Sequence, residues 1–195
     1  MKKEMSTNSR IGILLPHNGG SKGSDRSFIR SIYCHWDGYP SHMGMALHQS
    51  YGTVDLVSEL LDKGDARLIN SDGNSEHFNM HSEGGQDATT CTFDHFMGYH
   101  LEEYNYIAVP VPNPMGLYTN VEWVMQDNRD PSKVATFTLV VNELLKNVPA
   151  SYNLTTNEVQ KLYMDRNRIQ ERKPDVLSTV QCLYDASVNK ELTRI

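Results

Sequence analysis

The sequence predicts an α+β fold: a small antiparallel sheet with helices on one side, followed by a C-terminal helical extension. Two observations favour this class. Up to about residue 126, short apolar runs end at proline or glycine, as in strands joined by turns. After Asp130 the apolar residues instead recur every three or four positions, which is typical of amphipathic helices. The expected organisation is a loose tail over 1–9, a core domain over 10–126 and a three-helix extension over 127–195.

The first two strands are predicted over Arg10–Pro16 and over residues 27–36, joined by a flexible glycine-rich connection over 17–26. Successive side chains of a strand point to opposite faces. In the second strand, one set of alternating residues is the more apolar and is expected to face the core: Phe28, Arg30, Ile32, Cys34 and Trp36. The other set is expected to face outward: Ile29, Ser31, Tyr33, His35 and Asp37.

A turn and two helices are predicted next. The Asp37-Gly38 pair favours a turn, and Pro40 cannot continue a strand ladder. Ser41 is expected to cap a helix over 42–51. A second helix is expected to begin with Thr53 as its N-cap and to end at a C-terminal glycine, Gly64. Its buried stripe is predicted to consist of Val54, Val57, Leu60 and Leu61.

The middle of the chain predicts a short strand over 65–69 and then a polar surface hairpin and loop over 70–91. A short helix is expected to begin at Phe93. Two further strands, over 104–111 and 120–126, are separated by a loop and can pair as an antiparallel hairpin.

The C-terminal third predicts three helices, through which the chain could also form a homo-oligomer. Asp130 and Pro131 fit the N-cap and the first position of a helix over 130–148. Thr155 and Glu158 form a capping box at the start of the second helix. The third helix follows Pro174. Its expected buried stripe is Val176, Val180, Leu183, Tyr184 and Val188.

Composition narrows the function classes. The net charge is -6 and the isoelectric point is about 5.7, so the surface repels phosphate backbones and general nucleic-acid binding is not expected. No apolar run approaches the roughly 20 residues that span a bilayer, so no membrane association is expected. Three separated cysteines, with no export signal, predict a cytoplasmic protein. No cofactor is predicted.

The octapeptide YCHWDGYP, Tyr33–Pro40, ends the second predicted strand. Further along the chain lie Gly44, Leu47, Tyr51, the segments LLDKGD and EEYNYIAV, and Trp123. In these residues the chain resembles a family of uncharacterised phage and prophage-type bacterial proteins. The resemblance covers roughly residues 10–126 and implies a phage-like origin, with the host cytoplasm as location, and continuity of fold. It implies no particular activity.

The same octapeptide contains the main candidate site. Tyr33, His35 and Asp37 share one face of the strand, and with Tyr39 and His42 they are a candidate pocket for a small polar or aromatic ligand. A simpler interpretation is structural: Asp37 caps its own turn and orients His35, and the aromatic rings pack around this turn. Residues 33–42 are called the corner below. A divalent metal held by His35, Asp37 and His42 is a third possibility, although this spacing matches no established ligand motif.

Other candidates have mainly structural interpretations. Cys34 would need a base within reach to act as a nucleophile, and buried free cysteine is usually inert. His77 and His81 would share a face on a helix, but the surrounding pattern favours a strand whose histidine side chains face solvent. The glycine-rich loop lacks the ending of a phosphate loop. The basic segment Met164–Lys173 is either a solvated helix face or a surface for a partner or RNA.

The sequence therefore leaves three functional hypotheses. The first is a phage-type accessory protein, not an enzyme, that binds a host protein or small ligand through the 33–42 corner, the C-terminal helices, or both. The second is a hydrolase that uses His35 and Asp37, with or without a metal and His42. The third is a structural virion component.

Overall fold

The computed structural model describes residues 7–15, 27–98, 102–129, 136–146, 148, 153–172 and 176–192. The predicted loose tail up to residue 6, the glycine-rich connection and the Asp130–Pro131 helix start lie outside these described residues.

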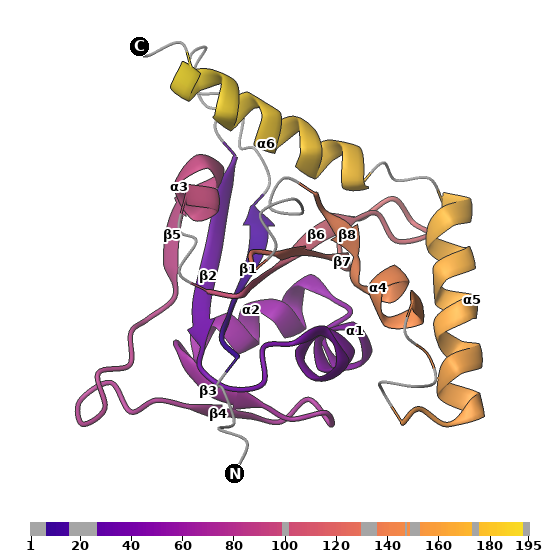
Figure 1. Cartoon of the computed structure of the whole chain (residues 1–195), viewed down its shortest axis with the longest axis horizontal. Helices are drawn as coiled ribbons and strands as arrows, with labels where there is room; N and C mark the ends of the chain where they lie inside the picture. The colour runs from indigo at the N-terminus through magenta and orange to yellow at the C-terminus, as the bar shows by residue number, and fades with distance from the viewer. Residues whose placement is uncertain are drawn as a thin grey trace.

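A mixed sheet forms the centre of the molecule (Figure 1), and the predicted α+β class is confirmed. The strand order is β4-β3-β2-β1-β6-β7-β8, and β5 also pairs with β2. Most neighbours are antiparallel, but β1 runs parallel to β6 and β2 parallel to β3, so the sheet is larger and less uniform than predicted. The strands are β1 Ser9–Leu15, β2 Phe28–Cys34, β3 Ala66–Ile69, β4 Ser75–His77, β5 Thr89–Thr92, β6 Tyr104–Val111, β7 Asn120–Asp127 and β8 Thr138–Leu139.

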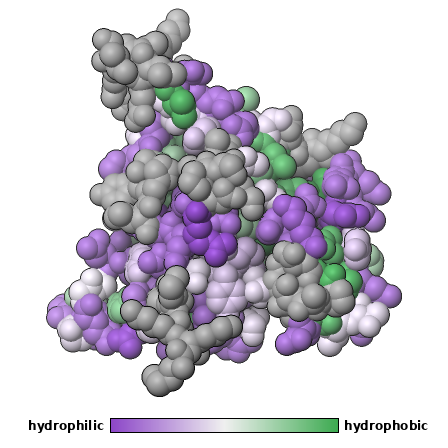
Figure 2. Space-filling model, in the orientation of Figure 1, coloured by the Kyte–Doolittle hydropathy of each residue, from purple (hydrophilic) through white to green (hydrophobic). Residues whose placement is uncertain are grey.

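The helices pack around this sheet. In Figure 1, α6 crosses one end of the sheet and α5 runs along one side. The face shown in Figure 2 is mostly hydrophilic, and its hydrophobic side chains are scattered along α6 and in the region between α4 and α5. The helical elements are a π-helical turn η1 Pro40–Gly44, α1 Met45–Ser50, α2 Val54–Asp62, α3 Phe93–Gly98, α4 Val140–Lys146, α5 Thr156–Arg172 and α6 Val176–Leu192.

Both faces of the central strands are covered. All residues of β6 from Tyr104 to Val109 are buried, and successive residues point to opposite faces. On the face that carries Tyr106 and Trp123, the indole Nε1–H of Trp123 donates to the carbonyl of Tyr51 at 2.8 Å, which joins β7 to the end of α1. Both faces of the central strands are thus buried, whereas the sequence predicted helices on one side of the sheet only.

Helix α2 forms as its sequence predicts. The Thr53 hydroxyl accepts a hydrogen bond from the amide of Leu56 at 3.4 Å, which satisfies one of the free amides of the first turn. Gly64 follows the helix with φ +76°, a conformation that glycine adopts without steric cost. Val57, Leu60 and Leu61 are buried as predicted, whereas Val54, the fourth residue of the predicted stripe, is only half-buried.

One predicted helix cap is wrong, and part of another predicted helix is a strand. Ser41 lies inside the π-helical turn η1, in which Pro40 occupies the first turn and no side chain caps the amides. Within the described residues, the helix predicted over 130–148 is present over Val140–Lys146, and Thr138 and Leu139 instead pair with β7 as strand β8. The sequence TFTLVV is rich in β-branched and aromatic residues, which favour a strand over a helix.

The two long C-terminal helices follow their predicted patterns more closely. Glu158 accepts from the amide of Thr155 at 2.7 Å and the Thr155 hydroxyl accepts from the amide of Glu158 at 3.3 Å, so the predicted capping box is confirmed. Val176 and Val180 of α6 are buried, whereas Val188 is exposed and does not belong to the packed stripe. Among the described residues, no helix is long and apolar enough to cross a membrane.

Candidate functional site at the end of strand β2

The corner that follows β2 is held by backbone hydrogen bonds on both sides. The amide of His35 donates to the carbonyl of Ala66 at 3.0 Å, and the amide of Trp36 donates to the carbonyl of Arg67 at 2.9 Å. The amide of Gly38 donates to the carbonyl of Thr7 at 2.8 Å. The corner backbone is therefore tied to β3 and to the N-terminal segment.

The predicted alternation along β2 is only partly correct. Cys34 and Ile32 are buried as expected, but Trp36 and Phe28 are exposed. Regular pairing ends at Cys34, and Asp37 then adopts φ +54°, so the alternating direction of side chains does not extend to Trp36. Ile29 and Ser31, expected to face outward, are buried.

Cys34 has the properties of a structural thiol. Its side chain is fully buried, and burial raises its pKa to about 12. The sulfur lies 3.8 Å from the carbonyl oxygen of Trp36 and 3.9 Å from that of Arg67. A nucleophilic cysteine needs a thiolate and access to substrate, and this position provides neither.

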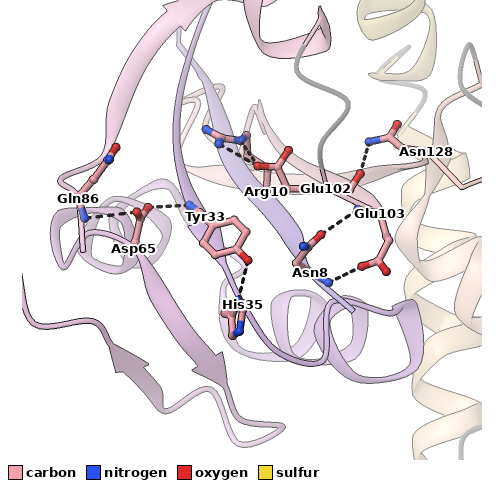
Figure 3. A network of polar contacts seen from close by, with 9 residues as sticks. All are labelled: Asn8, Arg10, Tyr33, His35, Asp65, Gln86, Glu102, Glu103 and Asn128. Atoms are coloured by element: carbon pink, nitrogen blue, oxygen red, sulfur yellow. Dashed lines mark hydrogen bonds and ion pairs between the residues drawn. The ribbon is translucent and has the colours of Figure 1, made fainter. Parts of the chain in front are cut away.

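The predicted platform residues Tyr33 and His35 are brought together. The Tyr33 hydroxyl lies 2.7 Å from Nδ1 of His35 (Figure 3). The His35 ring also meets Trp36 edge-on, with a centroid separation of 4.9 Å, and meets Phe78 at 6.1 Å. Partial burial raises the pKa of Tyr33, so the phenol stays neutral at physiological pH. Phe78 directly follows β4, and its contact with His35 was not predicted from the sequence.

Asp65 is a positioning residue that the sequence analysis also missed. Its Oδ1 accepts from the backbone amide of Tyr33 at 2.9 Å, and its Oδ2 accepts from the amide of Gln86 at 3.3 Å. Figure 3 shows this carboxylate between β2 and the segment that leads to β5. The signal in the sequence is its place directly after the C-terminal glycine of α2.

Asp37 and Tyr39 interact with each other. The negative charge of Asp37 and a hydrogen bond to it raise the pKa of Tyr39, after the larger effect of partial burial. Tyr39 is 37% exposed and Trp36 is 46% exposed, so both rings present a large part of their surface to solvent.

His42 does not join His35 and Asp37 in a ligand set. Its Nε2–H donates to the carbonyl of Ile69 at 2.8 Å, so the ring is turned toward β3. Across the part of the chain that the structure describes, no group of three His, Cys, Asp or Glu side chains is arranged to hold a metal ion.

The other histidine pair is also separated by its local structure. His77 lies in β4, where its Nδ1 is 2.8 Å from the carbonyl of Gly64 and its Nε2 is 2.8 Å from the hydroxyl of Ser75. His81 lies in the following turn and is exposed. The strand predicted for His77 is present, and the two rings do not share a helix face.

A polar network supports the corner from the N-terminal side (Figure 3). Arg10 donates to Oε1 of the buried Glu102 at 2.9 Å from Nη2 and at 3.1 Å from Nε. The amide of Glu103 donates to Asn8 Oδ1 at 3.2 Å, and the amide of Asn8 donates to Glu103 Oε2 at 2.5 Å. Arg10 is also paired in register with Tyr33, so the network and the corner share one strand pair.

No family model, curated protein or solved structure matches the chain. The chemistry of the corner follows from its geometry. That geometry presents Trp36 and Tyr39 on a fixed backbone, beside a hydrogen-bonded Tyr33–His35 pair. Such a surface can stack on and hydrogen-bond to a partner.

Proposed function

We propose that this chain is a phage-type accessory protein without catalytic activity that binds a host protein in the cytoplasm through the corner around Trp36. The observation that carries the proposal is the 46% exposure of an indole whose backbone is fixed by hydrogen bonds to β3. The phage-type origin is supported by the resemblance of the octapeptide Tyr33–Pro40 and nearby segments to phage and prophage proteins.

The physical support is the pre-organisation of the aromatic side chains. Tryptophan and tyrosine are enriched at the energetic centres of protein interfaces. Trp36 packs edge-on against His35, which is itself bonded to Tyr33, so binding would cost little side-chain entropy. An indole that is half exposed on a fixed backbone would bury substantial apolar surface against a partner.

The hydrolase alternative has weaker support. The His35 Nδ1 is already bonded to Tyr33, the His42 Nε2 is bonded to a backbone carbonyl, and Cys34 is buried. A general base must reach the proton that it removes, and a nucleophile must be accessible. No specific observation favours the virion hypothesis over the binding hypothesis.

Site-specific photo-crosslinking tests the proposal. A benzophenone amino acid in place of Tyr39, which is 37% exposed in the same corner, keeps the Trp36 indole, and in the full chain expressed in host cells it is expected to give a discrete adduct with one protein. The matched control carries the same amino acid in place of Tyr163, which is 44% exposed but lies on α5. Adducts of equal yield and identity from both positions, or none from position 39, would contradict the proposal.

The substitution Trp36→Ala provides an independent readout. It is expected to weaken binding of the crosslinked partner at least tenfold, the size of effect seen for central aromatic residues at interfaces. The Tyr163→Ala variant is expected to bind as the natural chain does. Circular dichroism of both variants checks that the fold is retained.

A further inference from the structure

A large groove lies at the other end of β2 from the corner. It has a volume of about 1430 Å³ and is lined by the ends of β1, β2 and β6, the prolines that follow β6, the first half of α2 and one side of α6. Strand β2 has seven residues, so the two ends lie roughly 20 Å apart at about 3.3 Å per residue. The groove and the corner are therefore separate surfaces.

The groove is lined mainly by apolar side chains. These include Leu14, Val54, Val109 and Leu183, together with Pro110 and Pro112. Small-molecule sites usually have volumes of roughly 300–1,000 Å³, so this groove is large enough for a segment of polypeptide. The sequence between Leu15 and Ser27, both of which line the groove, carries no apolar side chain beyond Pro16. That segment of the chain therefore cannot supply an apolar face for the groove.

The rim next to β6 is a rigid apolar loop. The side chain of Asn113 accepts from the amides of Met115 at 2.9 Å and Leu117 at 3.0 Å, and donates to the hydroxyl of Thr119 at 3.0 Å. These bonds hold Met115, Leu117 and Tyr118 in solvent, with exposed fractions of 79%, 55% and 67%. Exposed apolar side chains on a fixed loop beside an apolar groove are typical of a protein-binding surface.

A second rim, formed by α2 where the amide of Val54 donates to the carbonyl of Thr119, is acidic. Val54 and Ser58 of α2 line the groove, and Asp55 and Glu59 follow each of them on the exposed side of the same helix. Arg30, the basic residue of the lining, is already paired with Asp62 at 2.6 Å. A partner with positive charges beside an apolar face would complement both the lining and this rim.

We propose that this groove binds an amphipathic helix with basic residues, contributed by a partner protein. The mode is a helix laid in a groove: apolar side chains every three or four residues contact the lining, and Lys or Arg residues meet Asp55 and Glu59. The inference goes beyond the proposed function, because it assigns a second partner surface to the opposite end of the sheet.

A designed peptide tests this inference on the full chain. The probe is a fluorescein-labelled 18-residue helix of Leu and Lys with one apolar face, and the matched control replaces every Lys with Glu. Fluorescence anisotropy is expected to show at least tenfold tighter binding of the Leu/Lys peptide. Equal affinity for the two peptides, or no binding of either, would overturn the proposal.

Charge reversal locates the binding. The double substitution Asp55→Lys, Glu59→Lys is expected to weaken binding of the Leu/Lys peptide at least tenfold. The control Glu76→Lys, Glu171→Lys makes the same change in net charge at exposed positions away from the groove and is expected to change affinity less than twofold. Equal losses in both variants would show non-specific attraction and refute the site. If the double variant does not fold, Glu59→Lys alone replaces it, with an expected loss of at least threefold.

Cys182 supplies a readout inside the groove, since it is exposed and part of the lining. A saturating concentration of the Leu/Lys peptide is expected to slow its reaction with a thiol reagent at least fivefold. The Cys182→Ser variant identifies the contribution of this thiol to the measured rate. A bound peptide that leaves this rate unchanged must lie elsewhere, which would overturn the proposal.

Discussion

The substitution Gly38→Ala tests how the corner is built. A Cβ atom added at Gly38 would lie 2.7 Å from the carbonyl carbon of Asn8, 2.8 Å from its oxygen and 2.9 Å from Cβ of Ser9. Two of these three atoms belong to the backbone, so no side-chain rotation relieves the overlap. The N-terminal segment and the corner have to move apart.

The expected cost has two sources. Overpacking against a fixed neighbour destabilises by about 1–3 kcal/mol. Separation of the segments also weakens two hydrogen bonds, from the Gly38 amide to Thr7 and from the Tyr106 hydroxyl to the Gly38 carbonyl, each worth about 0.5–1.5 kcal/mol. The free energy of unfolding should therefore fall by about 2–6 kcal/mol, a large part of the ~5–15 kcal/mol typical of a domain.

Urea unfolding, followed by the fluorescence of the buried Trp123, measures this loss. The matched control is Gly52→Ala, because a Cβ atom there has no neighbour within 4 Å. Its unfolding free energy is expected to change by less than about 0.5 kcal/mol. If Gly38→Ala unfolds at the same urea concentration as Gly52→Ala, the close approach of Asn8 does not constrain the corner and the reasoning is wrong.

Three further predictions concern single groups. Burial raises the pKa of Cys34 to about 12, so Cys34→Ser should leave the thiol reactivity of the folded chain at pH 8 unchanged; a lower count of reactive thiols would contradict this. Burial lowers the pKa of His48, which contacts Asp165 at 3.0 Å. The unfolded chain therefore binds more protons, and stability should fall as the pH drops below about 6.5. The urea midpoint should shift less between pH 7.5 and 5.5 in His48→Gln, and an equal shift would exclude this role. Thr155→Ala removes the capping hydroxyl of α5 and should cost about 0.5–2 kcal/mol in urea unfolding, together with faster amide exchange in the first turn; unchanged exchange would refute the cap.

Local sequence patterns predicted most of the elements. Thr53 and Gly64 mark the ends of α2, and Thr155 marks the start of α5, because each satisfies backbone groups within a few residues of itself. The pairing of 104–111 with 120–126 was predictable for the same reason, since the two strands are close in sequence. Interactions of this kind depend on the neighbouring residues alone.

The errors at the corner have a longer-range cause. Trp36 is exposed because β2 stops pairing regularly at Cys34, and that end is set by the bonds from His35 and Trp36 to β3. Those partners lie about thirty residues further along the chain, beyond the reach of an alternation argument. The same applies to Asp65, whose role depends on the parallel placement of β3 beside β2.

The burial of both faces of the sheet was likewise not predictable from periodicity. In β6, polar Asn105 lies between apolar residues, and alternation would place it in solvent. In the structure its side-chain amide donates to Gln126 Oε1 at 3.3 Å across the strand pair, and both side chains are buried. A buried amide pair of this kind can be recognised only when the partner strand is known.

The strands at the margins of the sheet are short: β4 has three residues, β5 has four and β8 has two. Long unpaired margins invite strands of other molecules to add on, which leads to aggregation or fibres. The segment before α2 also forms backbone hydrogen bonds with the outer side of β7 near Asn120, where the amide of Val121 donates to the carbonyl of Gly52. Concentrated solutions of the chain should therefore resist fibril formation, and self-association should use side-chain surfaces instead of shared sheets.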